Sequence, residues 1–218
     1  MFTGIIEATG TVTSLQQLGA EWRIAVDSER LDFSDVKIGD SIAVSGCCLT
    51  VVEFGKRGFS ADVSNETLAC TTLGKFAAGT RVNLEKAMLA TARFGGHIVS
   101  GHIDGVGKLV ESTIDGKSIR LRFEVPTALA RYIAAKGSIC IDGTSLTVNE
   151  VSGITFTVNV IPHTQQETVI GNYSIGQPVN LEVDIVARYL ERLLSANGEA
   201  ALKSDGISSE LLARHGFK

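Results

Sequence analysis

Two stretches of the chain that lie 97 residues apart have nearly the same sequence. Residues 41–53 read SIAVSGCCLTVVE and residues 138–150 read SICIDGTSLTVNE, and seven of these thirteen positions are identical. The same offset, without a gap, aligns two further pairs of segments, 62–87 with 159–184 and 2–12 with 99–109. Chance similarity does not hold one register over so much of a chain, so we interpret the sequence as two tandem copies of one domain.

The repeat also predicts the domain boundaries. A period of 97 residues is too long for a solenoid, and two copies are too few. Two domains of this size can each bury a core. We place the seam near residues 93–96, which gives a first domain over residues 1–96 and a second over residues 97–184. Residues 185–218 have no counterpart in the first copy and are predicted to form a C-terminal helix and tail.

Short apolar runs separated by glycines fill each copy. This pattern is typical of strands in a small sandwich or barrel, and no long helix alternates with the runs as a parallel α/β fold would require. We therefore predict an all-β fold. In the first copy we expect strands at 23–26, 41–44, 49–53, 59–63 and 81–85. We also expect two short helices, at 31–36 in the first copy and at 127–135 in the second.

The sequence DIVARYLERLLSANG, residues 184–198, is amphipathic at helical spacing. Its apolar stripe consists of Val186, Tyr189, Leu190, Leu193 and Leu194. We expect this helix to end at Gly198. The stripe requires an apolar partner, which is either the chain's own β-domains or the same helix of other chains. Residues 207–218 are expected to add a short helix or to lie loose.

Composition excludes several classes of protein. The chain has 218 residues with 44% hydrophobic and 20% charged residues and a net charge of −4, which is an ordinary globular composition. A pI near 5.6 without clusters of basic residues argues against nucleic-acid binding. No apolar run is long enough for a membrane span, and the first twenty residues contain no basic residue, which argues against a signal peptide.

Four cysteines indicate the compartment. Cys47 and Cys48 are adjacent, Cys70 and Cys140 are isolated, and no C-x-x-C pair is present, so neither a zinc site nor a disulfide framework is predicted. Free thiols are typical of the reducing cytoplasm, where we expect the protein to reside.

Common catalytic and cofactor motifs are missing from the sequence. It contains no phosphate-binding loop, G-x-G-x-x-G, H-E-x-x-H or G-x-S-x-G, and its carboxylates lack metal-ligand spacing, so we predict no metal and no cofactor. The duplication then suggests the chemistry. Two copies of a binding domain can hold two copies of one ligand, and ligands held face to face can react with each other through proximity and orientation.

Five segments together resemble the riboflavin synthase family, the trimeric type built from lumazine-binding barrels. They are MFTGIIEATGTV at 1–12, GCCLTV at 46–51, GGHIVSGHIDG at 95–105, DGTSLTVNEV at 142–151 and IPHT at 161–164. The resemblance covers about residues 1–190 and implies two tandem six-stranded Greek-key β-barrels related by internal duplication. It also implies a homotrimer held partly by the C-terminal helix.

The resemblance further implies a reaction, the dismutation of two 6,7-dimethyl-8-ribityllumazine molecules. A four-carbon unit passes from one molecule to the other, which gives riboflavin and 5-amino-6-(D-ribitylamino)uracil without a metal or redox cofactor. Two lumazines would bind per site, between the first barrel of one subunit and the second barrel of its neighbour. The implied substrate-binding residues are Phe2, Gly4, Ile5, Ile6, Cys48, Leu49, Thr50, Asp62, Val63, Ser64, Asn65, Glu66, Thr67, Gly101, His102, Ile103, Lys136, Ser145, Leu146, Thr147, Ile161, Pro162, His163, Thr164, Gln165, Gln166 and Asp184.

The repeat separates these candidates by an independent criterion. Positions that the two copies share should bind what two like ligands share, and hydroxyls and glycines suit a flat polar ring. Positions that differ should make one ligand the donor and the other the acceptor. The shared pairs are Ser41/Ser138, Gly46/Gly143, Thr50/Thr147, Thr67/Thr164 and Gly4/Gly101. The differing pairs are Ile5/His102, Cys48/Ser145, Gly39/Lys136, Ser64/Ile161 and Glu66/His163.

His102 is the strongest catalytic candidate. The reaction must remove a proton from the 7-methyl group of the donor, and imidazole is the side chain that exchanges protons near neutral pH. The alternative is a histidine that orients a strand or a neighbouring subunit. His97 is interpreted as structural, or as an interface residue at the domain seam.

Ser41, Cys48 and Thr147 are the other catalytic candidates, by resemblance to the family. Cys48 would donate a hydrogen bond or act as a weak nucleophile, and its alternative role is a small buried apolar residue. If Leu49 and Val51 fill the barrel, then Cys48 and Thr50 face outward, and the ligand lies on the barrel's flank. Cys47 is expected to point into the core.

Three further candidates have structural alternatives. Phe2 is expected either to pack near the site or to anchor the first strand, and Lys136 either to contact a ligand oxygen or to lie free at the surface. Asp184 is expected either to contact the site or to cap the following helix. The main alternative function is a non-catalytic lumazine- or flavin-binding protein of the same fold, and a more distant one is an interaction protein that binds no small molecule.

Overall fold

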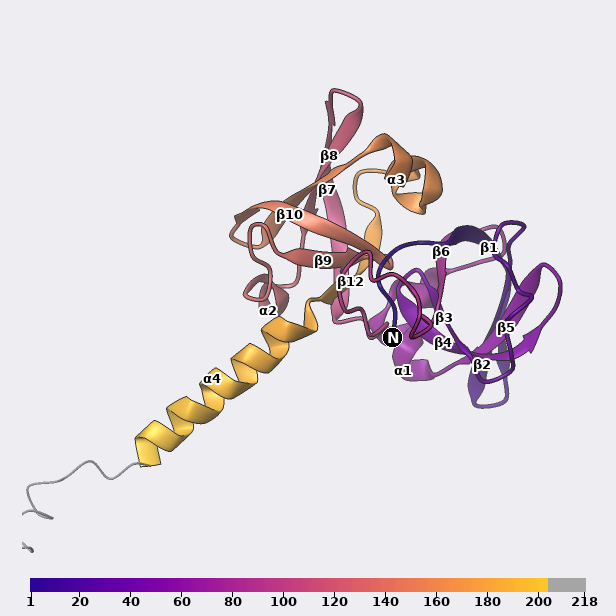
Figure 1. Cartoon of the computed structure of the whole chain (residues 1–218), viewed down its shortest axis with the longest axis horizontal. Helices are drawn as coiled ribbons and strands as arrows, with labels where there is room; N and C mark the ends of the chain where they lie inside the picture. The colour runs from indigo at the N-terminus through magenta and orange to yellow at the C-terminus, as the bar shows by residue number, and fades with distance from the viewer. Residues whose placement is uncertain (204–218) are drawn as a thin grey trace, which may run out of the picture. The chain divides into compact units, whose positions relative to one another are not determined.

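The computed structural model describes residues 1–203, with side chains to residue 195. It contains two closed, antiparallel, six-stranded β-barrels (Figure 1). The first has the strand order β1-β2-β5-β4-β3-β6, and the second repeats it as β7-β8-β11-β10-β9-β12. The all-β prediction, the duplication and the Greek-key barrels are therefore confirmed.

The strands of the first barrel are β1 (Ala8–Leu18), β2 (Glu21–Asp27), β3 (Ser41–Val44), β4 (Cys47–Phe54), β5 (Gly58–Val63) and β6 (Arg81–Lys86). Those of the second are β7 (Gly105–Asp115), β8 (Ser118–Glu124), β9 (Ser138–Ile141), β10 (Thr144–Ser152), β11 (Thr155–Val160) and β12 (Pro178–Val183). The helices are α1 (Asn65–Cys70), η1 (Thr72–Lys75), α2 (Thr127–Ala130), α3 (Pro162–Glu167), η2 (Val169–Asn172) and α4 (Ile185–Lys203).

Alternation along β4 decides which side chains can meet a ligand. Leu49 and Val51 are buried in the core of the first barrel, whereas Thr50 is exposed and Cys48 is half-buried on the outer face. Cys47 lies in the core, as predicted. Because strand side chains alternate between the two faces, the outer face of β4 is the one available for binding.

The helices differ from the sequence predictions in several places. The helix expected at 31–36 does not form, because the Asp32 carboxylate accepts the Ser34 amide in a local turn (2.9 Å) that competes with helix formation. The helix expected at 127–135 is a single turn, α2. Helices α1 and α3 were not predicted.

The C-terminal helix forms, but the expected stop at Gly198 is wrong. Helix α4 continues to Lys203, because a single glycine costs a helix only about 1 kcal/mol and the following residues favour helix. Considered by itself, α4 carries an exposed apolar stripe in which Val186, Tyr189, Leu190, Leu193 and Leu194 are each more than half exposed. The expectation for residues 207–218 lies outside the described residues.

The two barrels are joined by contacts that repeat in pairs with the same offset of 97. Asn83 donates to the Asp142 carbonyl and accepts the Val169 amide, both at 2.8 Å. Its counterpart Asn180 donates to the Ser45 carbonyl (2.9 Å) and accepts the Thr72 amide (2.8 Å).

Phe2 and Val99, another pair at this offset, exchange both backbone hydrogen bonds and are buried in a small cluster with Ala43 and Cys140. The barrels are thus related by an approximate two-fold axis that the duplication produced.

Candidate functional site

The predicted residues of the first barrel gather on the outer face of β4 and at the end of β5. β5 runs antiparallel to β4, with Ala61 opposite Val51, so the segment that leads into α1 lies beside Cys48 and Thr50. Ser64 caps α1 by accepting the Thr67 amide (3.1 Å), and its hydroxyl also lies 3.0 Å from that of Thr67. The Asp62 carboxylate is held by Arg23 through two hydrogen bonds, which lower its pKa. The Asp62 side chain is therefore bound to Arg23 of β2, and only the backbone of Asp62 is left to contact a ligand.

The second barrel repeats this arrangement with different side chains. Ser145 is half-buried and Thr147 exposed on β10, and α3 begins directly after β11 with Pro162 at its start. Ile161 occupies the position of Ser64 and makes no side-chain cap. His163 is exposed and Thr164 half-buried at the start of α3. The two groups therefore share a backbone framework and differ in polarity.

Each barrel receives its remaining site residues from the leading segment of the other copy. The Cys48 amide donates to the Gly101 carbonyl (2.8 Å), and the Ser145 amide donates to the Gly4 carbonyl (2.7 Å). We call two groups of residues the first and second half-sites. The first half-site comprises Cys48, Thr50, residues 62–67 and residues 101–103. The second half-site comprises residues 4–6, Ser145, Thr147 and residues 161–166.

This exchange places His102 beside Cys48 rather than beside its own barrel's Ser145. Sequence reasoning missed the exchange, because local patterns contain no record of which copy a segment packs against. A partial signal was present in Gly4 and Gly101, which are repeated glycines. Both have positive φ (+77° and +82°), and a Cβ at either would lie within 2.6 Å of the Cβ of Ser145 or Cys48. Only glycine permits such a close approach of backbone to backbone.

His97 contacts the second half-site. It is 7% exposed, and its Nδ1 lies 2.7 Å from the Ser145 hydroxyl. Burial lowers the pKa of His97, and the nearby Asp184 opposes that shift. The buried Nε2 makes no protein hydrogen bond in the described structure.

Lys136 adopts an unusual backbone conformation for a lysine. Its φ is +67°, its amide donates to the Val148 carbonyl (2.8 Å), and its side chain is exposed. Its counterpart in the first barrel is Gly39, with φ +92°. A non-glycine residue in this region costs roughly 1–2 kcal/mol, so the exposed lysine is held at this turn despite strain.

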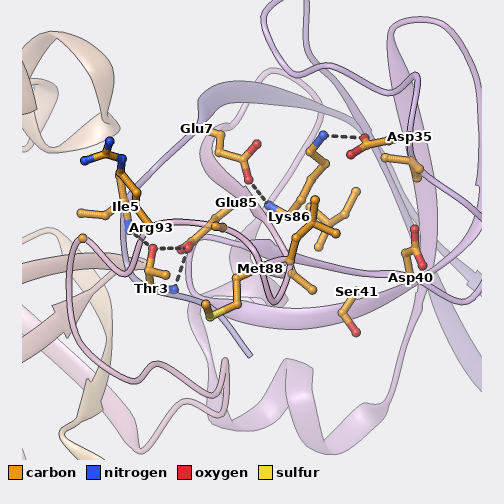
Figure 2. Close-up of a pocket in the computed structure, with 16 residues that line it drawn as sticks. Thr3, Ile5, Glu7, Asp35, Asp40, Ser41, Glu85, Lys86, Met88 and Arg93 are labelled. Carbon is orange, nitrogen blue, oxygen red and sulfur yellow. Dashed lines mark hydrogen bonds and ion pairs between the residues drawn. The ribbon is translucent and has the colours of Figure 1, made fainter.

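Ser41 lies at the edge of a cavity that Ile5 of the second half-site also lines. It is opposite Thr50 in the β3–β4 register, and its counterpart Ser138 is opposite Thr147. The cavity has a volume of about 650 Å³, and Figure 2 shows Ser41 and Asp40 at one end and Ile5 and Arg93 at the other. Cys48, Thr50 and His102 lie outside its described lining. Of the four catalytic candidates, Ser41 therefore lies nearest to this cavity, which is large enough for a small molecule.

A salt bridge and a buried carboxylate border the same cavity. Lys86 binds Asp35 at 2.6 Å and the Asp32 carbonyl at 2.9 Å, while Glu85 holds Thr3 (Figure 2). Among residues 1–203, no three His, Cys, Asp or Glu side chains are grouped as metal ligands. None of the helices in that part of the chain is long and apolar enough to cross a membrane.

Comparison with known proteins agrees with this architecture. A model of the lumazine binding domain matches residues 3–87 and again residues 100–184. The structure of LumP complexed with riboflavin has a TM-score of 0.77 at 24% identity, covering 84% of this chain and 99% of that chain. LumP complexed with 6,7-dimethyl-8-(1'-D-ribityl) lumazine gives a TM-score of 0.75, with the same identity and coverage. These structures show the shared fold.

Curated sequences give a closer relationship. Riboflavin synthase from Photobacterium phosphoreum is 48% identical over 217 residues, which is 100% of this chain and 99% of the relative's length. The enzymes from Actinobacillus pleuropneumoniae and Bacillus subtilis (strain 168) are 46% and 39% identical, each with both chains fully covered. The duplicated barrel and its paired half-sites thus define a protein of the lumazine-binding-domain class. Within that class, the chain belongs to the riboflavin synthase family.

Proposed function

We propose that the protein converts two molecules of 6,7-dimethyl-8-ribityllumazine into riboflavin and 5-amino-6-(D-ribitylamino)uracil. The observation that carries this proposal is the pair of half-sites built on one backbone framework. Each half-site contains a threonine on the outer face of β4 or β10, a glycine turn from the other copy, and a threonine in helix α1 or α3. Two equivalent half-sites suit a reaction whose two substrates are identical.

The differences between the half-sites suggest how identical substrates acquire different roles. His102 and Cys48 lie in the first half-site, so a base that removes the proton from the 7-methyl group would act on the lumazine bound there. Ser145, supported by His97, and Thr147 lie in the second half-site, where their hydroxyls would bind and polarise the partner ring. For Ser41, Phe2, Lys136 and Asp184 we propose supporting contacts to the bound substrates.

A fluorescence assay tests the function directly. Purified protein is mixed with 6,7-dimethyl-8-ribityllumazine, and the emission of riboflavin is followed without added metal or redox cofactor. We expect riboflavin and the uracil product to form in equal amounts. One tightly bound lumazine per chain without conversion would instead identify a binding protein, and a flat calorimetric titration would identify an interaction protein.

We also propose a homotrimer whose reaction sites lie between the first barrel of one subunit and the second barrel of its neighbour. The exposed stripe on α4 supports association, because five large apolar side chains on one helix are typical of a helix that packs against another chain. A cytoplasmic location is proposed with it, since all four cysteines are free thiols, including the exposed Cys70.

Removing α4 tests the assembly. A chain that ends after Asp184 retains every strand of both barrels, so we expect folded protein of lower mass by multi-angle light scattering. A second variant, Leu190→Ala with Leu193→Ala in the full chain, removes two side chains of the stripe while keeping the helix. It should also weaken the assembly. A truncated chain that remains trimeric would remove α4 from the interface.

A further inference from the structure

Two buried carboxylates hold the leading segments that complete the half-sites. Glu182 on β12 is 3% exposed and accepts the Ser100 amide (2.6 Å), the Ser100 hydroxyl (2.7 Å) and the Gly101 amide (2.9 Å). Glu85 on β6 is 4% exposed and accepts the Thr3 amide (2.7 Å), the Thr3 hydroxyl (2.7 Å) and the Gly4 amide (3.0 Å), as seen for Thr3 in Figure 2. The two sets of three bonds are identical in pattern.

Each set extends by one more bond to the residue that faces a half-site. The His102 amide donates to the Ser100 hydroxyl (3.3 Å), and the Ile5 amide donates to the Thr3 hydroxyl (3.2 Å). The hydroxyls thus connect each carboxylate to the backbone of the next residue but one. A carboxylate that accepts several backbone amides fixes a turn more firmly than neutral acceptors do.

The turns so fixed act on the opposite barrel. Glu182 belongs to the second barrel, but the Gly101 carbonyl that it places accepts the Cys48 amide of the first. Glu85 belongs to the first barrel, but the Gly4 carbonyl that it places accepts the Ser145 amide of the second. Both turns contain a glycine that has no room for a Cβ, so a small shift of either turn moves the strand it touches.

We infer that Glu182 is a positioning residue for the first half-site and Glu85 for the second, each acting across the boundary between the barrels. Glu182 sets the places of His102 and Cys48 together, because both depend on the turn that it holds. Glu85 sets Ile5 and Ser145 in the same way. The barrels are therefore coupled through their sites as well as through their interface.

Matched glutamine variants test this inference in the full chain. In Glu182→Gln, one oxygen becomes an NH₂ group, so in either orientation of the amide at least one backbone N–H of the turn faces a donor. Glu85→Gln makes the same change at the same depth of burial, so each variant controls for the general cost of the substitution. Amide hydrogen exchange, measured at single residues, reports the Cys48 and Ser145 amides separately.

We expect a crosswise result. Glu182→Gln should speed exchange of the Cys48 amide roughly tenfold, the factor that one lost hydrogen bond is worth, and change that of Ser145 by less than about threefold. Glu85→Gln should do the reverse. Equal changes at both amides, changes confined to the variant's own barrel, or no change would each overturn the inference. If either glutamine variant fails to fold, Ser100→Ala and Thr3→Ala remove the hydroxyl bonds alone and should give the same crosswise pattern at smaller size.

The inference depends on the proposed function only in that the half-sites bind substrate. In the active enzyme, Glu182→Gln should lower kcat about tenfold more than Glu85→Gln, because only the former displaces His102, and equal losses would contradict its action through His102. Hydrogen exchange needs no substrate. A crosswise exchange pattern without riboflavin formation would therefore overturn the proposed function and support the inference. Riboflavin formation without a crosswise exchange pattern would support the proposed function and overturn the inference.

Discussion

Replacing His102 with Gln should lower turnover about 10²-fold, the usual contribution of a general acid–base group, while the fold is retained. His102 is exposed, and its backbone amide, rather than its ring, makes the hydrogen bond that the turn requires. Glutamine preserves the backbone contacts and can still form hydrogen bonds, but it cannot take up a proton in the neutral range. The loss should therefore appear in kcat, with KM changed only a few-fold.

The repeat provides a matched control for this prediction. Ile5 occupies the equivalent position in the second half-site, so Ile5→His places an imidazole in the same backbone setting on the other side. Added to His102→Gln, it should not restore turnover if the base is required in the first half-site. Steady-state kinetics and the thermal unfolding midpoint distinguish a catalytic effect from a folding one. Unchanged kcat in His102→Gln would remove the imidazole from the reaction, and restoration by Ile5→His would remove the distinction between half-sites.

Barrel architecture could be predicted from the sequence because its determinants are local and repeated. Alternation in residues such as Leu49, Thr50 and Val51 assigns each side chain to a face, and the second copy repeats the assignment. The outward position of Cys48 and Thr50 followed from that alternation, which also predicted a ligand on the flank of the barrel. Helix α1 was missed although Ser64 is a favourable N-cap, and α3 although Pro162 is favourable at a helix start. Both helices have only six residues, too few for a periodic apolar pattern.

The composition of each half-site could be predicted only in part. The repeat distinguished shared from differing positions, but it did not indicate which barrel the turn before His102 contacts. The hydrogen bonds that decide this link residues far apart in sequence, such as Cys48 with Gly101, and one sequence does not record such pairings. The contact of His97 with Ser145 was missed for the same reason. The aligned segments of the second copy begin at residue 99, so comparison of the two copies did not include His97.

The approximate two-fold axis is broken at Asp142. This residue occupies the position of Ser45, is 6% exposed, and accepts hydrogen bonds from the Tyr173 hydroxyl and the Asn180 amide. Burial raises its pKa from 3.8 to about 7, against the opposing effect of those two bonds. Lys75 and Arg81 line the adjoining cavity of about 350 Å³ between the barrels. The first barrel has Ser45 and Phe76 at the equivalent places, so a charge is buried on one side of the interface only.

A raised pKa of an acid means that its ionisation opposes folding. Below about pH 4, Asp142 is protonated in both the folded and the unfolded chain, so it contributes nothing to the dependence on pH. Between about pH 4 and pH 7, the folded state keeps a proton that the unfolded state releases, and the free energy of unfolding falls as pH rises. Above pH 7 the loss of folding free energy is constant, at roughly 4 kcal/mol for a shift of this size.

Asp142→Asn should therefore raise the free energy of unfolding at pH 8 by about 2 kcal/mol and change it little at pH 4. Asparagine retains an oxygen for the Asn180 amide, donates to the Tyr173 oxygen, and tolerates the positive φ of +44° at this position. Tyr173→Phe is the opposing control, because it removes a donor from the ionised carboxylate and should destabilise the protein more at pH 8 than at pH 4. Urea unfolding across this range measures both variants. The opposite result would be a free energy of unfolding that rises from pH 4 to pH 7 in the unsubstituted protein and no longer rises in Asp142→Asn. That result would contradict the prediction, because it would mean that the surroundings stabilise the ionised carboxylate and that the buried charge favours docking of the barrels.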